Sequence, residues 1–243
     1  MSLRKQYQDQ VEAFTKVCHR LAHNMYVTGY GGNLAWKLEQ NLVMITPTQR
    51  NKGDVKSKDV VFVDLAGNVV EGKQRPTGEL PMYQKFFNER PDVTSVIHCH
   101  PPYVCAMAIS AGENHLMRPL YPETTTEIGP VPVVPYAQPL TDALAEKFSP
   151  YLQKYNSFIM ENHGLVTMSR DDIEWTLMNV EVLESTAQSI FLALSAGGIK
   201  ELSPEAVRGL GEVMSQRNLP LFGAPGVNSS LEALYFDGDG NRL

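Results

Sequence analysis

Short apolar runs that alternate with amphipathic helical patterns are the feature that most constrains the fold of this chain. Four runs rich in β-branched residues have the length of strands: 42–45, 60–63, 94–97 and 157–160. Apolar residues recur at helical spacing in longer segments, among them 3–23, 79–90 and 171–196. Helices interleaved with strands are typical of a layered α/β domain, and a hairpin predicted at residues 60–70 argues against an all-parallel sheet. The sequence therefore predicts a three-layer α/β/α sandwich with a mixed central sheet.

Length and composition limit the classes of protein to which the chain can belong. With 243 residues it can bury one large core, and we expect a single domain over residues 1–220. The tail at residues 221–243 is expected to cover a neighbouring subunit or to be mobile. A formal net charge of −6 argues against a nucleic-acid partner, which requires a basic surface. No apolar stretch approaches a membrane span, and three cysteines form no disulfide framework, so we expect a cytoplasmic protein with no membrane partner.

Three histidines form the pattern that most directly suggests chemistry. His98 and His100 are two residues apart at the end of a predicted strand, so their imidazoles point to the same face. His163 follows the apolar run at 157–160, at the end of another predicted strand. Three imidazoles with one open coordination position are typical of a catalytic zinc site. The residue pattern alone leaves open that each histidine is an ordinary polar residue with a satisfied hydrogen bond.

Seven short motifs follow one another in a fixed order along the chain. They are Gly32-Asn33-Leu34, Ile45-Thr46-Pro47-Thr48, Asp64 to Gly72, Arg75-Pro76-Thr77-Gly78-Glu79, Arg90 to His100, Gly129 to Tyr136, and Asn162-His163-Gly164. A chain with this series resembles the class II aldolase/adducin family, which includes zinc-dependent sugar-phosphate aldolases such as the L-fuculose-1-phosphate aldolases. The resemblance covers about residues 8–195.

The resemblance implies a metal-dependent lyase. In the family, the positions matching His98, His100 and His163 bind one zinc ion per subunit, and the position matching Glu79 is a fourth ligand or the catalytic base. The implied reaction is the cleavage of a ketose, with a ketose 1-phosphate favoured, to a dihydroxyacetone-type product and an aldehyde through a metal-stabilised enediolate. From the residues alone, Glu79 also suits the positively polarised start of a helix, and both roles can hold together.

The resemblance also implies a site for the phosphate of the substrate. The matching residues are Gly32, Asn33, Thr48, Gln49, Thr77 and Gly78. Two departures from the family pattern bear on the substrate, because Gly78 replaces a serine and Gln49 replaces a glycine. The segment after Gln49 adds two cations, Arg50 and Lys52, which we expect to bind a phosphate or a carboxylate. Ordinary turn chemistry and a solvated loop are the alternatives.

Tyr121 is the candidate for the catalytic acid. It precedes Tyr136 by fifteen residues, and a tyrosine at this spacing in the family donates a proton to the aldehyde-derived oxygen. That tyrosine reaches in from a neighbouring subunit, so the resemblance implies a homo-oligomer, specifically a homotetramer. The alternative from the residues is a loop aromatic that packs on Pro119 and Pro122.

Other reactions are known for the same set of histidines, and they remain alternatives. Pentulose-phosphate 4-epimerases, sugar-phosphate dehydratases and sugar-phosphate decarboxylases share it, but the epimerases usually carry aspartate at the position of Glu79, which favours the aldolase. A non-catalytic binding module of the adducin type is a more distant alternative. It lacks the metal ligands that this chain retains.

Overall fold

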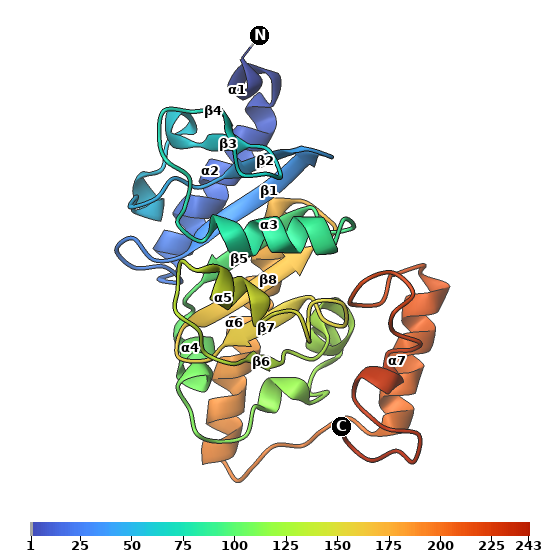
Figure 1. The fold of residues 1–243 in the computed structure, drawn as a ribbon. Helices are drawn as coiled ribbons and strands as arrows, with labels where there is room; N and C mark the ends of the chain where they lie inside the picture. Colours follow the sequence, from blue (N-terminus) through green and yellow to red (C-terminus); the bar gives the residue numbers. More distant parts are fainter. Residues whose placement is uncertain (1) are drawn as a thin grey trace.

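An eight-stranded mixed sheet forms the middle of the computed structural model, which describes residues 2–243 (Figure 1). Its strands are β1 (Asn33–Glu39), β2 (Leu42–Ile45), β3 (Val61–Val63), β4 (Val69–Glu71), β5 (Ser95–Cys99), β6 (Val133–Val134), β7 (Ser157–Met160) and β8 (Gly164–Ser169). Their order across the sheet is β4-β3-β2-β1-β5-β8-β7-β6. Strand β6 runs parallel to β7, and the other neighbouring pairs are antiparallel. The mixed sheet and the hairpin of β3 and β4 are therefore confirmed.

Helices flank the sheet. They are α1 (Leu3–Gln6), α2 (Gln8–His23), α3 (Leu80–Glu89), α4 (Pro102–Ala108), α5 (Asp142–Glu146), α6 (Ile173–Ser195) and α7 (Pro204–Gln216). Short 3₁₀ turns span Lys52–Asp54, Ser57–Asp59, His115–Met117 and Glu232–Leu234, and a π-helical turn spans Thr124–Ile128. In the described residues, no helix combines the length and the apolar composition needed to cross a bilayer.

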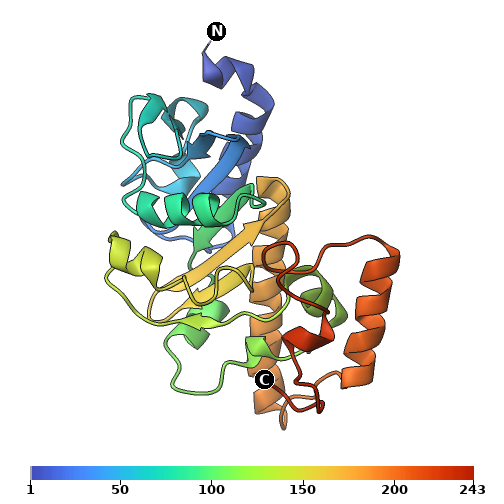
Figure 2. The ribbon, with the colours of Figure 1, turned by 45° about the vertical axis from the view of Figure 1, so that its right-hand side comes forward.

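Each face of the sheet has its own core. Helices α2, α4 and α6 cover one face, where Phe14, Ile97 and Leu183 are buried together. Helices α3 and α5 cover the other face, where the Phe148 ring packs edge-on against Phe86 at 4.8 Å. In Figure 2 the long helix α6 runs past the sheet, and α7 stands at the periphery. The three-layer α/β/α sandwich is therefore confirmed.

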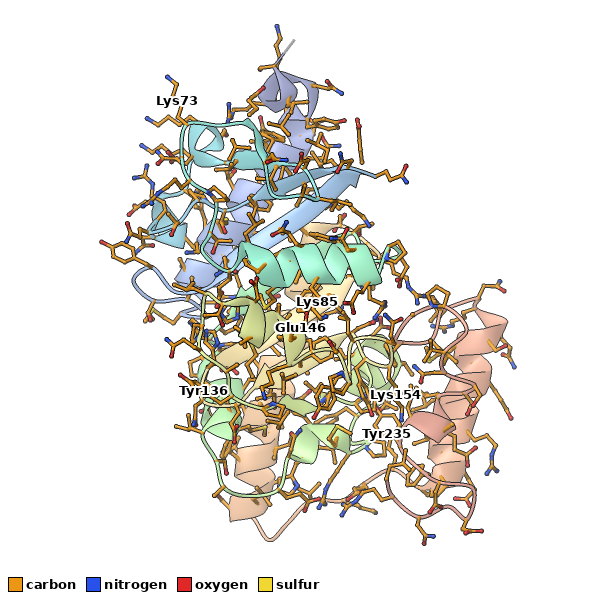
Figure 3. The ribbon with its side chains drawn as sticks, in the orientation of Figure 1. Lys73, Lys85, Tyr136, Glu146, Lys154 and Tyr235 are labelled. Carbon is orange, nitrogen blue, oxygen red and sulfur yellow. The ribbon has the colours of Figure 1, made fainter. Side chains whose placement is uncertain are left out.

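One cation joins the two helices on the second face. Lys85 Nζ lies 2.7 Å from Glu89 within α3 and 3.2 Å from Glu146 in α5. Figure 3 shows Lys85 and Glu146 facing each other between these helices. Since the two carboxylates are largely exposed, the contact orders the surface more than it stabilises the fold.

The predicted opening helix is interrupted. Tyr7 adopts φ −109° and ψ 40°, which ends α1 and lets α2 begin at Gln8. Its hydroxyl donates to Glu39 on β1, while the Arg4 guanidinium pairs with Glu71 on β4 at 2.9 Å. These contacts with the sheet accompany a bend in the chain at Tyr7. The apolar residues of the sequence keep their helical spacing across this position, so the pattern gives no sign of the break. The single helix predicted over residues 3–23 was therefore wrong at this point.

The C-terminal segment packs against α7 and the second core. Phe222, Leu231, Leu234, Tyr235 and Phe236 are buried there. Tyr235 lies toward α7 in Figure 3. The division into a domain at residues 1–220 and a tail at 221–243 that covers a neighbouring subunit or is mobile stays a prediction.

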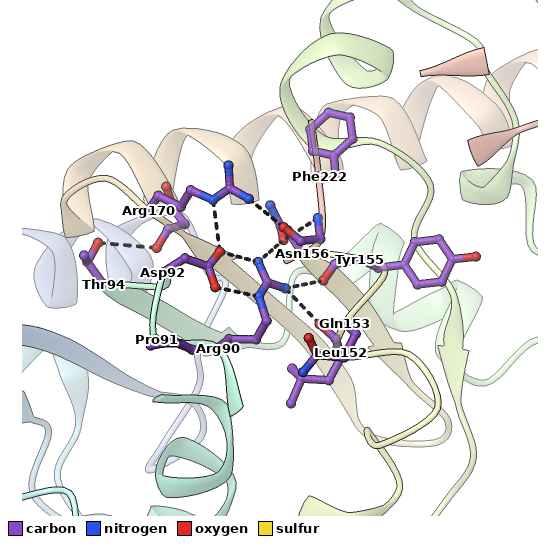
Figure 4. Close-up of polar contacts among 12 residues, drawn as sticks. Arg90, Pro91, Asp92, Thr94, Leu152, Gln153, Tyr155, Asn156, Arg170 and Phe222 are labelled. Carbon is purple, nitrogen blue, oxygen red and sulfur yellow. Dashed lines mark hydrogen bonds and ion pairs between the residues drawn. The ribbon is translucent and has the colours of Figure 1, made fainter. Parts of the chain in front are cut away.

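A buried arginine links this segment to the sheet (Figure 4). The Arg90 guanidinium, which is fully buried, donates to both carboxylate oxygens of Asp92 at 2.9 and 2.8 Å, and to Asn156 Oδ1 at 3.0 Å. Arg170 Nε contacts the same Asp92 at 3.0 Å, and its Nη2 donates to the carbonyl of Gly223. The network thus connects the end of α3, strand β8 and the C-terminal segment.

Replacement of Arg90 by alanine tests this network. Arg90→Ala leaves Asp92 with Arg170 as its remaining cationic partner and removes the donor to the carbonyls of Leu152 and Tyr155, so we expect it to lower the free energy of unfolding by about 3–5 kcal/mol in urea titrations. Arg208→Ala, which removes an exposed partner of Glu232, is the control and should leave this free energy almost unchanged. Equal effects of the two variants would contradict the role given to Arg90.

Candidate metal centre

The pairing of three central strands brings distant residues to one place. Strand β5 pairs with β1 on one side, where Asn33 lies opposite His98, and with β8 on the other, where Leu165 lies opposite Cys99. The turn between β7 and β8 carries His163. The ends of these strands therefore surround His98 and His100.

The turn that carries His163 depends on an asparagine. Asn162 has a φ of +53°, in the left-handed region that asparagine tolerates better than most residues. Its N–H donates to the carbonyl of Ala108 at 2.8 Å, and the N–H of His163 donates to Met160 at 3.0 Å. These contacts close a tight hairpin and direct the His163 ring toward β5.

The three imidazoles converge. One ring nitrogen from each of His98, His100 and His163 lies within 4.8 Å of the others. The His98 ring centroid is 4.7 Å from each of the other two, and those two are 5.6 Å apart. The structure therefore brings together the three predicted metal ligands.

The buried nitrogens of these rings fit a cation. His98 Nδ1 lies 2.9 Å from the carbonyl of Leu165, which requires Nδ1 to carry the proton and leaves the Nε2 lone pair free. Among residues 2–243, Nε2 of His98 and Nε2 of His100 are buried without a hydrogen-bond partner. Such unpaired buried atoms are costly unless a ligand satisfies them. The donor set suits a divalent cation of the zinc type.

Burial also keeps the rings in the form that binds metal. It lowers the pKa of His98 to about 3 and that of His100 to about 3, with the neighbouring imidazoles adding to the effect. Burial lowers the pKa of His163 too, although the nearby Glu79 carboxylate opposes the shift. All three rings are therefore neutral at pH 7, as metal ligation requires.

Glu79 faces the histidines from the start of α3. Its Oε2 lies 3.5 Å from His98 Nε2, and its Oε1 lies 3.6 Å from His163 Nε2. Two atoms bound tetrahedrally to one ion at ~2.1 Å are roughly 3.4 Å apart, so the carboxylate lies at the spacing expected of a fellow ligand. Asn33 Nδ2 donates to Glu79 Oε2 at 2.7 Å, and the buried Tyr83 hydroxyl contacts Asn33 Oδ1 at 2.6 Å. This chain of hydrogen bonds fixes the position of the carboxylate.

Glycines leave the room that the rings occupy. A Cβ at Gly31 would lie 2.8 Å from His100 Nδ1, and one at Gly164 would lie 2.5 Å from His100 Cδ2. Gly32, at φ +66°, approaches the carbonyl of His98, where a Cβ would lie 2.8 Å away. The glycine-rich turn therefore shapes the metal centre, besides its predicted part in binding phosphate.

The predicted anion-binding segments lie next to one another. Thr77 N–H donates to the carbonyl of Thr46, and Thr48 N–H donates to that of Arg75, both at 3.0 Å. This pairing brings Thr48 beside the turn at Thr77 and Gly78, which leads directly into Glu79. Gln49 is exposed and has a φ of +54°. A role of these residues in binding phosphate stays a prediction.

Lys52 is buried rather than solvated. Only 2% of its surface is exposed, and its Nζ donates to the carbonyls of Tyr30 at 3.1 Å and Arg50 at 3.0 Å. Burial lowers the pKa of Lys52, while interactions with Cys18 and with the Glu79 carboxylate oppose that shift. Within the described part of the chain, no carboxylate lies within ion-pair distance of this ammonium. A buried cation with one unused N–H is suited to an incoming anion.

Tyr121 lies elsewhere. It is 45% exposed and borders a surface groove along α6 together with Glu123, Met178 and Ser185. No hydrogen bond or aromatic contact joins it to the three histidines in residues 2–243. Its predicted role as an acid contributed by a neighbouring subunit stays a prediction.

The sequence patterns did not reveal the structural roles of three residues in or beside the centre. Tyr83 looks like a core residue of α3, and its hydroxyl contact with Asn33 depends on tertiary packing. Gly164 follows His163 at the start of β8, and the need for a glycine there follows only from its closeness to the His100 ring. Glu161 accepts the N–H of Tyr136 at 2.9 Å and ties a loop beside the site. Of these three residues, only Gly164 belongs to a motif that the sequence singled out, Asn162-His163-Gly164.

Comparisons with known proteins agree with this geometry. The family model described as "Class II Aldolase and Adducin N-terminal domain" matches residues 12–191. L-fuculose phosphate aldolase of Methanococcus maripaludis is 34% identical over 184 residues, which cover 76% of this chain and 97% of the relative. The 3-oxo-tetronate 4-phosphate decarboxylase of Pectobacterium atrosepticum is 29% identical, over 73% of this chain and 85% of the relative.

Solved structures show the same fold. YgbL of Klebsiella pneumoniae superposes with a TM-score of 0.77 at 29% identity, over 84% of this chain and 98% of that chain. An L-fuculose 1-phosphate aldolase superposes with a TM-score of 0.73 at 26% identity, over 86% and 96% of the two chains. The fold and the histidine cluster thus occur together in a chain similar to enzymes of two activities.

Replacement of Gly164 tests how closely the glycines hold the centre. Gly164→Ala would push its Cβ into His100 and the carbonyl of Cys99, so we expect zinc affinity to fall by about 10–100-fold in a competition titration with a chelator. Gly209→Ala is the matched control, since nothing lies within 4 Å of that position on α7. If both variants bind zinc with the affinity of the parent protein, the absence of a side chain at Gly164 is not needed to hold the His100 ring in its ligating position.

Proposed function

The chain belongs to the class II aldolase and adducin family, and we propose that it is a zinc-dependent aldolase. Its substrate in this proposal is a ketose, with a ketose 1-phosphate favoured, which is cleaved to a dihydroxyacetone-type product and an aldehyde. The observation that carries the proposal is the convergence of three neutral imidazoles, that of His98 buried and the other two half-buried, near the Glu79 carboxylate. The similarity to L-fuculose phosphate aldolases supports the choice of reaction.

His98, His100 and His163 would hold one zinc ion per chain, with Glu79 as a fourth ligand until substrate enters. A bound divalent cation supplies Lewis acidity, which draws electron density toward the carbonyl oxygen of the substrate. The hydrogen bond from His98 Nδ1 to Leu165 holds that ring in the tautomer and orientation that ligation needs.

Glu79 is proposed as the group that moves the proton at carbon. When the carbon–carbon bond of the ketose breaks, its electron pair moves toward the carbonyl, and the carbon that is left must gain a proton. The Glu79 carboxyl, held by Asn33 and backed by Tyr83, is placed to deliver it. In the reverse direction the carboxylate removes the same proton.

The oxygen of the departing aldehyde needs a second proton carrier. Tyr121 is our candidate, since the hydroxyl of the substrate must lose its proton as the aldehyde forms. Because Tyr121 lies beside α6 and away from the histidines of its own chain, the proposal requires a neighbouring subunit. A homotetramer is the proposed assembly, and the free cysteines fit a reducing cytoplasm as its location.

The anionic end of the substrate is assigned to the loops beside Glu79. Lys52 supplies the positive charge, and the turns at Gly32–Asn33, Thr48–Gln49 and Thr77–Gly78 supply further donors. A buried ammonium without a carboxylate partner is the main support for an anionic substrate.

Decarboxylation of a sugar-acid phosphate is the second candidate, favoured by the similarity to 3-oxo-tetronate 4-phosphate decarboxylases. Both reactions break a carbon–carbon bond and send its electrons toward a carbonyl, so both can use the same cation. They differ in that decarboxylation does not remove a hydroxyl proton before the bond breaks. In decarboxylation Tyr121 would therefore have no substrate proton to accept, whereas Glu79 would still protonate the carbon.

A substrate screen tests the proposed reaction. The zinc-loaded protein is incubated with ketose 1-phosphates, their unphosphorylated forms and 3-oxo-tetronate 4-phosphate, and the release of dihydroxyacetone phosphate, dihydroxyacetone or carbon dioxide is measured. His100→Ala should lose metal and turnover, whereas Glu79→Gln should keep the fold and lose about 10²–10⁴-fold in rate. The exposed His23→Ala is the control for loss of a histidine. If carbon dioxide is the only product, the proposed function changes from aldolase to decarboxylase. If Glu79→Gln is fully active, Glu79 has no part in the proposed mechanism.

Lys52 can be tested by direct binding. Lys52→Met keeps the length of the buried chain and removes its charge, so the affinity for dihydroxyacetone phosphate should fall by roughly tenfold or more, measured by calorimetry. Binding of dihydroxyacetone should change little, and the exposed Lys58→Met should bind both ligands like the parent protein. An unchanged affinity of Lys52→Met for the phosphate ester would exclude Lys52 from the anion site.

A further inference from the structure

The loop at residues 135–141 borders the metal centre and is held at both ends. Near its start, the N–H of Tyr136 donates to Glu161 Oε2 at 2.9 Å, in the turn between β7 and β8. At its end, Thr141 Oγ1 accepts the N–H of Leu144 at 3.4 Å and caps α5. Figure 3 shows Tyr136 at the surface on the side of α4 and α5. The backbone of the loop is therefore anchored at both ends.

Leu140 in this loop has an unfavourable backbone and an unfavourable environment. Its φ is +66°, in the left-handed region that a residue with a Cβ normally avoids. Its side chain is 62% exposed, so it contributes little to either core. Residues in such conformations cluster at functional sites, where the surrounding structure enforces them. Stability of the fold therefore does not explain a leucine at this position.

The Leu140 side chain lies directly over Gly78. A Cβ built on Gly78 would be 3.0 Å from Leu140 Cδ2 and 3.6 Å from both Cδ1 and Cγ, and these are its three nearest atoms. Gly78 connects the buried Thr77, whose Oγ1 accepts the N–H of Glu79 at 3.3 Å, to Glu79 itself. The isobutyl group thus covers the backbone that leads into the proposed proton carrier. We call this contact of Leu140 with Gly78 the Leu140 wall.

We infer that Leu140 is a specificity-determining residue for the terminal group of the substrate. The inference rests on the proposed function, in which the turn at Thr77 and Gly78 receives the anionic end. Hydrocarbon at this turn takes up volume and displaces water without offering a donor. A phosphate group loses more binding free energy through this loss of space and of hydrogen-bond donors than a smaller, neutral hydroxymethyl group does. The Leu140 wall therefore reduces the preference for phosphorylated substrates.

Lys52 and Leu140 act in opposite directions in this account. The buried ammonium of Lys52 attracts an anion, whereas the Leu140 wall reduces the space beside Gly78 and excludes water from it. The substrate class that suits both residues is a ketose with a compact end group. For such a ketose, the kcat/KM values of the phosphorylated and unphosphorylated forms differ less than the charge of Lys52 alone would make them differ. Changes at the two positions should shift selectivity with opposite sign.

A comparison of paired substrates tests the inference. For a ketose 1-phosphate cleaved in the screen and its unphosphorylated form, the ratio of kcat/KM values should rise by roughly tenfold in Leu140→Gly. Gly78→Ala, whose new Cβ crowds Leu140, should lower the ratio, and Gly78→Ala combined with Leu140→Gly should recover it. Leu192→Ala, which removes a leucine of similar exposure on α6, is the control and should leave the ratio unchanged.

A binding measurement keeps this test independent of the reaction. Calorimetric titration of the metal-loaded proteins with inorganic phosphate should show tighter binding by Leu140→Gly, at an unchanged or higher melting temperature, since glycine accepts the positive φ without strain. If no ketose is cleaved but phosphate affinity still rises, the proposed function fails and the role of Leu140 stands. Equal phosphate affinity of Leu140→Gly and the parent protein, or an unchanged ratio of kcat/KM values, would overturn the inference.

Discussion

The register of β5 between β1 and β8 is the constraint on which the rest of this structure depends. It sets His98 opposite Asn33 on one side and Cys99 opposite Leu165 on the other. Since side chains alternate along a strand, a slip of β5 by one residue would turn His98 into the opposite core and away from Glu79. Fully buried apolar residues on both faces of β5 make such a slip costly. The chemistry of the site is thus secured by the packing of the sheet.

Several features of the site are costly for the fold and become reasonable once ligands are considered. The imidazole nitrogens are buried without partners, the Lys52 ammonium is buried without a carboxylate, and Leu140 has a left-handed backbone. A protein selected for stability alone would avoid all three. In the proposed function, the binding of a cation and an anion near Glu79 offsets these costs.

The sequence patterns predicted the layers of the fold and the metal ligands for physical reasons that can be named. Strand alternation places His98 and His100 on one face, and the apolar periodicity identifies the helices on both sides of the sheet. The break at Tyr7 was not visible, because its cause is a contact with Glu39 that the periodicity does not record. Lys52 lies in a polar loop, so its burial could not be read from local composition. The contact of Leu140 with Gly78 joins segments far apart in the chain and leaves no local trace.

The central claim is that His98, His100 and His163 share one metal ion, with Glu79 beside it. The most direct measurement is an anomalous difference map, collected at the zinc absorption edge from crystals of the zinc-loaded protein. The account predicts one peak per chain, within bonding distance of a nitrogen from each of the three rings. A peak at another place, or rings that turn toward separate partners with no peak between them, would contradict it.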